Sequence, residues 1–93
     1  MKSKVFMINH QKGWIALLTE NGTFSIAEVL EMELPNIGDI ISGDIDSLGR
    51  ETFLNETQNE EIDVFVQDIL SGKKEAMRQL EIYNSNRNVW EVL

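Results

Sequence analysis

The sequence predicts a mainly β protein: an antiparallel barrel of five to six short strands followed by a short C-terminal helix. Two observations support this prediction. Short segments rich in β-branched, aromatic and long apolar residues alternate with polar residues at a period near two, and turn signals separate these segments. Only one segment, near the end of the chain, has apolar residues at the spacing of a helix.

The first three strands are expected in the first third of the chain. Residues 4–9 and 14–20 predict a hairpin, because the polar segment between them ends in Gly13. Asn21-Gly22 then favours a tight two-residue turn, since both positions tolerate positive φ. Residues 23–33 alternate in polarity and predict a third strand, which could be bent.

The next two strands follow a loop that Pro35 and Gly38 bracket. Residues 39–46 predict a fourth strand, in which Gly43 marks a bulge of the kind that barrel closure needs. After a short turn, residues 50–57 predict a fifth strand.

A sixth strand is predicted at residues 62–70, after a charged loop at 58–61. Every second residue is apolar and β-branched, namely Ile62, Val64 and Val66, and the residues between them are Asp63, Phe65 and Gln67. This alternation is typical of a half-buried strand. We expect this strand at the rim of the barrel. A rim strand has a free edge, so a homodimer through Ile62–Ile69 is a possible partner arrangement.

The C-terminal part is expected to pack on the barrel. Ser71 can cap a helix over residues 72–83, whose apolar face would contain Ala76, Met77, Leu80 and Tyr83. A polar turn is predicted at 84–88, and residues 89–93 form an apolar tail. We expect Trp90 to be buried, either against the barrel or against a second copy of the chain.

The length predicts one domain, with the barrel at residues 1–70 and the helix and tail at 71–93 packed on it. A chain of 93 residues buries about 60% or more of its unfolded surface, which is enough for one core. The apolar stretch at residues 5–8 is shorter than the ~7–15 residues of a signal peptide and the ~20 of a spanning helix. Together with the absence of cysteine, this predicts a soluble cytoplasmic protein.

The net charge of −8 is concentrated in the middle of the chain. Residues 1–27 carry +2, residues 28–68 carry −11 and residues 69–93 carry +1. Binding to a phosphate backbone depends on a cationic surface, so the acidic middle disfavours nucleic acid over most directions of approach. An acidic surface also serves solubility alone.

A family resemblance rests on the first strand and the turn after it. Met7-Ile8-Asn9 leads through a short polar loop to Lys12-Gly13-Trp14-Ile15-Ala16-Leu17, and residues 37–45 and 49–55 are similar to the later strands of the same kind of barrel. Over residues 4–57 the chain resembles a cold-shock domain, a barrel of the OB type. The sixth strand and the helix would extend that module.

The resemblance implies binding of single-stranded nucleic acid by stacking on exposed aromatic residues, at about 1–3 kcal/mol per base. The matching positions hold Met7 and Ala16 instead of aromatic residues, and Trp14 alone remains. Losing two or more stacking contacts weakens binding by about 2–6 kcal/mol. Lys4, Lys12 and Trp14 are the candidate nucleic-acid-binding residues that remain.

No catalytic or metal-binding pattern is present, so we expect a non-enzyme without cofactor or metal. The only histidine, His10, lies in a predicted turn without a second ligand or a nucleophile to accompany it. The preferred hypothesis is a protein-binding module, with Phe65 and Trp90 as candidate contact residues. The alternatives are weak binding of single-stranded RNA or DNA around Trp14 and, more remotely, an acidic mimic of nucleic acid.

Overall fold

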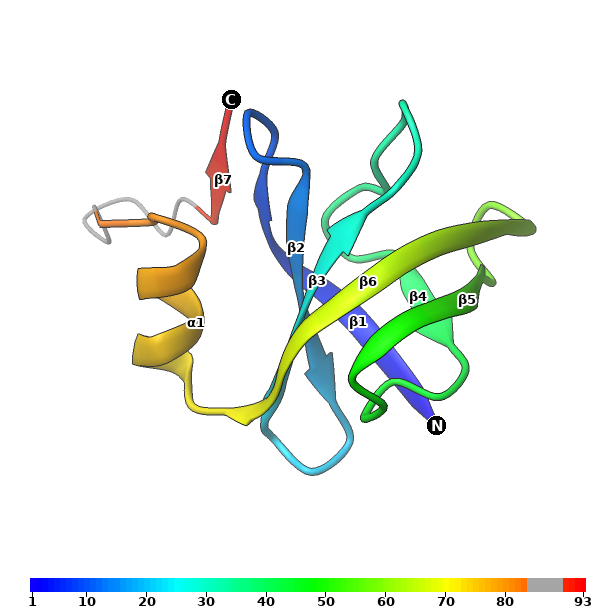
Figure 1. Ribbon diagram of the computed structural model, residues 1–93, viewed down its shortest axis with the longest axis horizontal. Helices are drawn as coiled ribbons and strands as arrows, with labels where there is room; N and C mark the ends of the chain where they lie inside the picture. The colour runs from blue at the N-terminus through cyan, green and yellow to red at the C-terminus, as the bar shows by residue number, and fades with distance from the viewer. Residues whose placement is uncertain (84–89) are drawn as a thin grey trace.

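The computed structural model describes residues 1–83 and 90–93 (Figure 1). In chain order its elements are β1 (Lys2–Asn9), β2 (Trp14–Thr19), β3 (Phe24–Val29), β4 (Ile40–Ser42), β5 (Gly49–Asn55), β6 (Glu60–Ser71), α1 (Lys73–Gln79) and β7 (Glu91–Val92). The polar turn predicted at 84–88 lies outside the described residues. Among those residues, no helix has the length and apolar character needed to cross a membrane.

Six antiparallel strands close into a barrel, which confirms the predicted fold class. The order around the barrel is β1-β2-β3-β6-β5-β4, and β4 pairs back onto β1. The seventh strand, β7, lies parallel to the second half of β1 (Figure 1). The barrel is OB-like in its size and closure, and one short helix follows it.

Apolar residues divide into two clusters on either side of the barrel wall. The inner cluster fills the barrel and contains Val5, Ile8, Ile15, Leu17, Ala27, Val29, Ile41, Ile45, Phe53, Ile62, Val64 and Val66. The outer cluster joins the outside of β1, β2 and β3 to the helix segment and contains Met7, Ala16, Phe24, Ile26, Ala76, Leu80 and Ile82. One side of these three strands is therefore covered, and Figure 1 shows α1 standing on that side, away from β4 and β5.

The boundaries of several strands differ from the predictions. The third strand ends at Val29, and the fourth is only three residues long because Gly43, with φ +139°, ends the extended backbone. The sixth strand is longer than predicted and begins at Glu60, so the predicted loop at 58–61 is shorter.

The prediction that the sixth strand has a free edge is wrong. β6 lies between two strands: its first part, from Glu60 to Val66, pairs with β5, and its second part, from Val64 to Ser71, pairs with β3. β6 is therefore an inner strand of the barrel wall, and the segment Ile62–Ile69 has β5 or β3 beside most of its length instead of lying at a rim.

The helix is also shorter than predicted. Its N-cap position is Gly72, with no side-chain cap, and the Ser71 hydroxyl donates instead to Asp68 (2.9 Å), so the prediction of a Ser71 cap is wrong. At the other end Glu81 adopts φ +58° and stops the helical path. As a result Leu80 is fully buried whereas Tyr83, expected on the same face, is 75% exposed.

Candidate binding surfaces

The surface on which the resemblance would place stacking aromatics is covered by the C-terminal helix. Met7 and Ala16 occupy two of the matching positions, and both are completely buried in the outer cluster with Ala76 and Leu80. Their side chains serve as a docking surface for α1. An aromatic residue would have no access to a base at either position.

Lys12 and Trp14 lie together beside the end of α1. The Lys12 ammonium is 4.1 Å from the centroid of the Trp14 ring, donates to the Gln79 carbonyl (3.0 Å) and pairs with the Glu81 carboxylate (3.5 Å). Trp14 is half-buried against the outer cluster. Both residues therefore attach the β1–β2 turn to the helix.

A hollow of about 380 Å³ next to Trp14 is lined by Lys12, Arg78, Gln79, Glu81 and Tyr83. Its cations already have carboxylate partners, because Glu81 faces Lys12 and Glu75 forms two hydrogen bonds with Arg78. Hydrogen bonds from Arg78, and then from Gln79, lower the pKa of Glu75 to about 2. The hollow thus presents little uncompensated positive charge.

Lys4 lies at the opposite end of the β1–β2 pair. Its register partners are Leu18 on β2 and Ile40 on β4. Trp14 is four residues from Leu18 along β2, which is about 13 Å at the usual rise of a strand. The structure therefore brings Lys12 and Trp14 together but leaves Lys4 apart from them.

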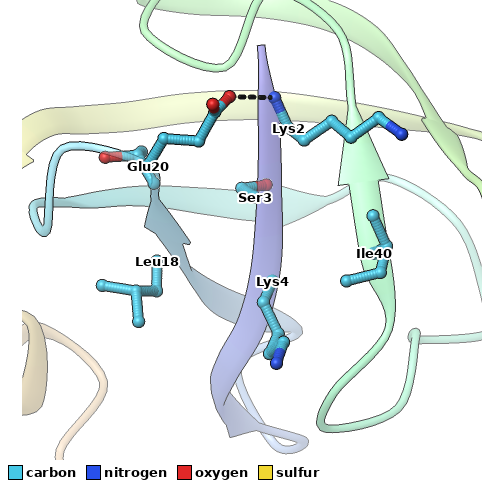
Figure 2. Close-up of a pocket in the computed structure, with 7 residues that line it drawn as sticks. Lys2, Ser3, Lys4, Leu18, Glu20 and Ile40 are labelled. Atoms are coloured by element: carbon cyan, nitrogen blue, oxygen red, sulfur yellow. Dashed lines mark hydrogen bonds between the residues drawn. The ribbon is translucent and has the colours of Figure 1, made fainter.

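A shallow pocket of about 280 Å³ surrounds Lys4 (Figure 2). Leu18 and Ile40 lie on either side of the lysine, and Lys2 and Glu20 lie near the N-terminal end of β1. The Lys2 backbone N–H donates to Glu20 (3.0 Å), and its ammonium pairs with Glu56 (3.1 Å). The carboxylates of Glu20 and Glu56 therefore offset the positive charge of Lys2, which would otherwise help this pocket to bind an anion.

The outer surface of β5, β6 and the end of β3 near Glu28 is open and carries Phe65 at its centre. Phe65 is 43% exposed and lies between Glu28 on β3 and Arg50 on β5. Two further exposed apolar residues lie on the same surface: Leu30, at 41%, beside Asp63, and Leu54, at 40%, opposite Glu61. We call this surface the acidic face; its residues are Glu28, Leu30, Glu31, Arg50, Thr52, Leu54, Glu61, Asp63, Phe65 and Gln67.

Polar contacts hold the acidic face in a defined arrangement. The Thr52 hydroxyl donates to the Asp63 carboxylate (2.7 Å), and the Leu30 backbone N–H donates to the Asp63 carbonyl (2.9 Å). The Gln67 amide donates to Glu28 (3.4 Å). Four carboxylates and one arginine lie on this face, so its formal charge is negative.

Trp90 packs against the barrel, which is one of the two predicted arrangements, but it is half-buried where full burial was expected. Its ring centroid is 5.0 Å from that of Phe6, and the Lys73 ammonium is 4.6 Å from the same ring. Sequence reasoning missed Phe6 and Lys73 as its partners. A strand pattern places Phe6 on one face of β1, but a β-bulge between Val5 and Met7 changes the register there.

Comparison with family models, curated proteins and solved structures found no match to this chain. The assignment of surfaces therefore rests on the geometry of the barrel itself.

Proposed function

We propose that the protein is a non-enzymatic binding module that engages a basic protein partner through the acidic face. The observation that carries the proposal is the position of Phe65: a large aromatic side chain, 43% exposed, in the middle of three paired strands and among carboxylates. Aromatic residues that a partner can bury are frequent energetic centres of protein interfaces, and charge complementarity speeds association and selects the partner.

The alternative of single-stranded nucleic acid has less support from the geometry. The outer face of β1–β3 is covered by α1, Lys12 is bonded to the helix end, and Lys4 is remote from Trp14. The open surface over β5, β6 and the end of β3 is the acidic face, which repels a phosphate backbone. The absence of cysteine from the sequence fits the reducing cytoplasm.

The proposal is tested with defined peptides and amide-resolved NMR. We expect a peptide that alternates lysine or arginine with valine or tryptophan to shift the amide signals of Phe65, Arg50 and Glu28, and a charge-reversed peptide to shift none. Phe65→Ala should weaken binding about 10- to 30-fold, as expected for the centre of an interface.

The matched control is Leu48→Ala. Leu48 is an exposed apolar residue, at 60%, in the β4–β5 connection and outside the acidic face. It should leave the affinity unchanged. Equal binding by wild type and Phe65→Ala, or signal shifts confined to α1 and β2, would refute the proposal.

A further inference from the structure

One row of side chains crosses the acidic face at right angles to its strands. Phe65 on β6 is paired with Glu28 on β3 and with Arg50 on β5, and directly opposite residues of antiparallel strands point to the same side of a sheet. The row therefore presents a carboxylate, an exposed aromatic ring and a guanidinium in that order. Neighbouring strands lie about 4.8 Å apart, so the two charged residues stand about 10 Å apart on either side of Phe65.

Arg50 is the cation of this row, and the rest of the described chain does not neutralise it. Its side chain is exposed, and the ion pairs among the described residues use other cations, namely Lys2, His10, Lys12 and Arg78. A partner that carried only bases would place a like charge on Arg50. A partner with a base at one end and an acid at the other complements both Glu28 and Arg50.

A helix matches the spacing of this row, whereas an extended segment does not. At Phe65 the main chain of β6 has a strand on each side, so a partner that covers the ring binds through side chains. In an extended segment residues i and i+3 are about 10 Å apart but point to opposite sides. In a helix residues i and i+7 are about 10.5 Å apart on one face, with residue i+4 between them. The barrel already carries a helix on its other outer face, where α1 packs on β1–β3.

We infer that the partner element on the acidic face is an amphipathic helix that crosses β3, β6 and β5, with a base at i, a large apolar residue at i+4 and an acid at i+7. The base faces Glu28, the apolar residue covers Phe65 and the acid faces Arg50. The outside of the barrel curves away on both sides of Phe65, and the long side chains of lysine, arginine and glutamate follow that curve. This inference rests on the function proposed above and adds that Arg50 selects an acid in the partner.

The test compares two helical peptides that differ at one position. Both are held helical by a staple on the side away from the protein and carry lysine at i and leucine at i+4, whereas position i+7 is glutamate in one and lysine in the other. The acidic face as a whole attracts the more basic peptide. We nevertheless expect wild type to bind the glutamate peptide about 3-fold more tightly in an NMR titration, which is the size of an exposed ion pair. Moving the glutamate to i+9, on the opposite side of the helix, should remove this gain.

Variants of Arg50 show whether the preference comes from this residue. Arg50→Glu should reverse it, so that the lysine peptide binds more tightly, and Arg50→Gln should remove it. The matched control is Lys74→Glu, which changes the net charge by the same amount at an exposed position on α1. This control should retain the preference of wild type.

The outcomes separate this inference from the proposed function. If the peptides shift the amide signal of Phe65 but the lysine peptide binds wild type as tightly as the glutamate peptide, the inference is overturned and the proposed function stands. The same holds if the extended alternating peptide shifts that signal and neither helical peptide does. If none of the peptides shifts it, both fail.

Discussion

The residues on which the resemblance to cold-shock domains rests serve, in this chain, to hold a helix. The Asn9 side-chain amide donates to the Leu80 carbonyl (2.9 Å) and the Lys12 ammonium donates to the Gln79 carbonyl (3.0 Å). The last carbonyls of a helix lack partners within it, and a cation near them is favourable. Asn9 and Lys12 therefore satisfy the end of α1 from the turn between β1 and β2.

A second residue, Asp39, organises the start of β4. Its carboxylate accepts hydrogen bonds from the Asn36 backbone (3.0 Å), the Asn55 amide (2.8 Å) and the Gln58 amide (2.7 Å). Burial alone would raise the pKa of Asp39, but these hydrogen bonds outweigh it and hold the pKa below its ordinary value. The sequence could not reveal this network, since its members are up to 22 positions apart and join only when the barrel closes.

Gly43 was predicted to mark a bulge within the fourth strand, but in the structure it lies just after β4, which ends at Ser42. It adopts φ +139°, and a Cβ there would lie 2.9 Å from Cδ1 of Phe53, which is itself in the inner cluster. Gly43→Ala should therefore lower the free energy of unfolding by about 2–4 kcal/mol, from backbone strain and overpacking together. Urea denaturation monitored by circular dichroism measures this change.

The control for this substitution is Gly22→Ala. Gly22 also has a positive φ, +79°, but no atom lies within 4 Å of its would-be Cβ. Only the backbone cost of about 1–2 kcal/mol applies. If Gly43→Ala and Gly22→Ala lower the free energy of unfolding equally, the close contact with Phe53 does not contribute to the cost at Gly43.

Local periodicity was enough to predict all six barrel strands. Alternation with a period of two indicates that one face of a strand is buried, as Ile62, Val64 and Val66 are. The same alternation occurs in edge and central strands, so it could not place β6 between β3 and β5. That pairing depends on contacts between residues about 40 positions apart, which no local pattern encodes.

The helix shows the same limit at its C-terminal end. Spacing placed Leu80 and Tyr83 on one face, but the positive φ of Glu81 ends the helix between them. The sequence gives no strong stop signal there, because Glu81 is neither glycine nor asparagine. The stop coincides with the contacts from Asn9 and Lys12, which arise only in the folded barrel.

The different burial of Leu80 and Tyr83 predicts different effects of their substitution on stability. Leu80→Ala removes a fully buried side chain from the outer cluster and should cost about 2–4 kcal/mol of unfolding free energy. Tyr83→Ala removes an exposed side chain and should change it by no more than about 0.5 kcal/mol. Chemical denaturation of both variants measures the difference. Equal losses would mean that the apolar face of the helix continues to Tyr83.

The barrel has two unlike sides: one is covered by α1, and the other is the open acidic face. The acidic middle of the sequence includes β5 and most of β6, and these strands carry the open acidic face. The end segments, where the lysines and most arginines lie, form β1 and α1, which pack on each other. Charge segregation was visible in the sequence. The covering of the β1–β3 face was not, because it needs the register of three strands as well as the position of α1.

This division predicts poor binding of single-stranded nucleic acid. In a Trp90→Phe background, where Trp14 is the only tryptophan, a thymidine oligonucleotide of 20 residues should leave Trp14 fluorescence unchanged at physiological salt. The physical reason is that Lys12 covers the Trp14 ring and is itself bonded to α1, while Lys4 lies about 13 Å away along the strands.

Even at low salt we expect a Kd above about 10⁻⁴ M, the weak end of the range for non-specific binding at physiological salt. At most three lysines could contribute, so the logarithm of the affinity should fall with that of the salt concentration by a slope of no more than about 2. Trp14→Ala in the wild-type background, followed through Trp90, separates stacking from simple charge attraction. Submicromolar binding at physiological salt that Trp14→Ala abolishes would show that α1 moves aside to open a stacking surface, and it would replace the acidic face as the functional site.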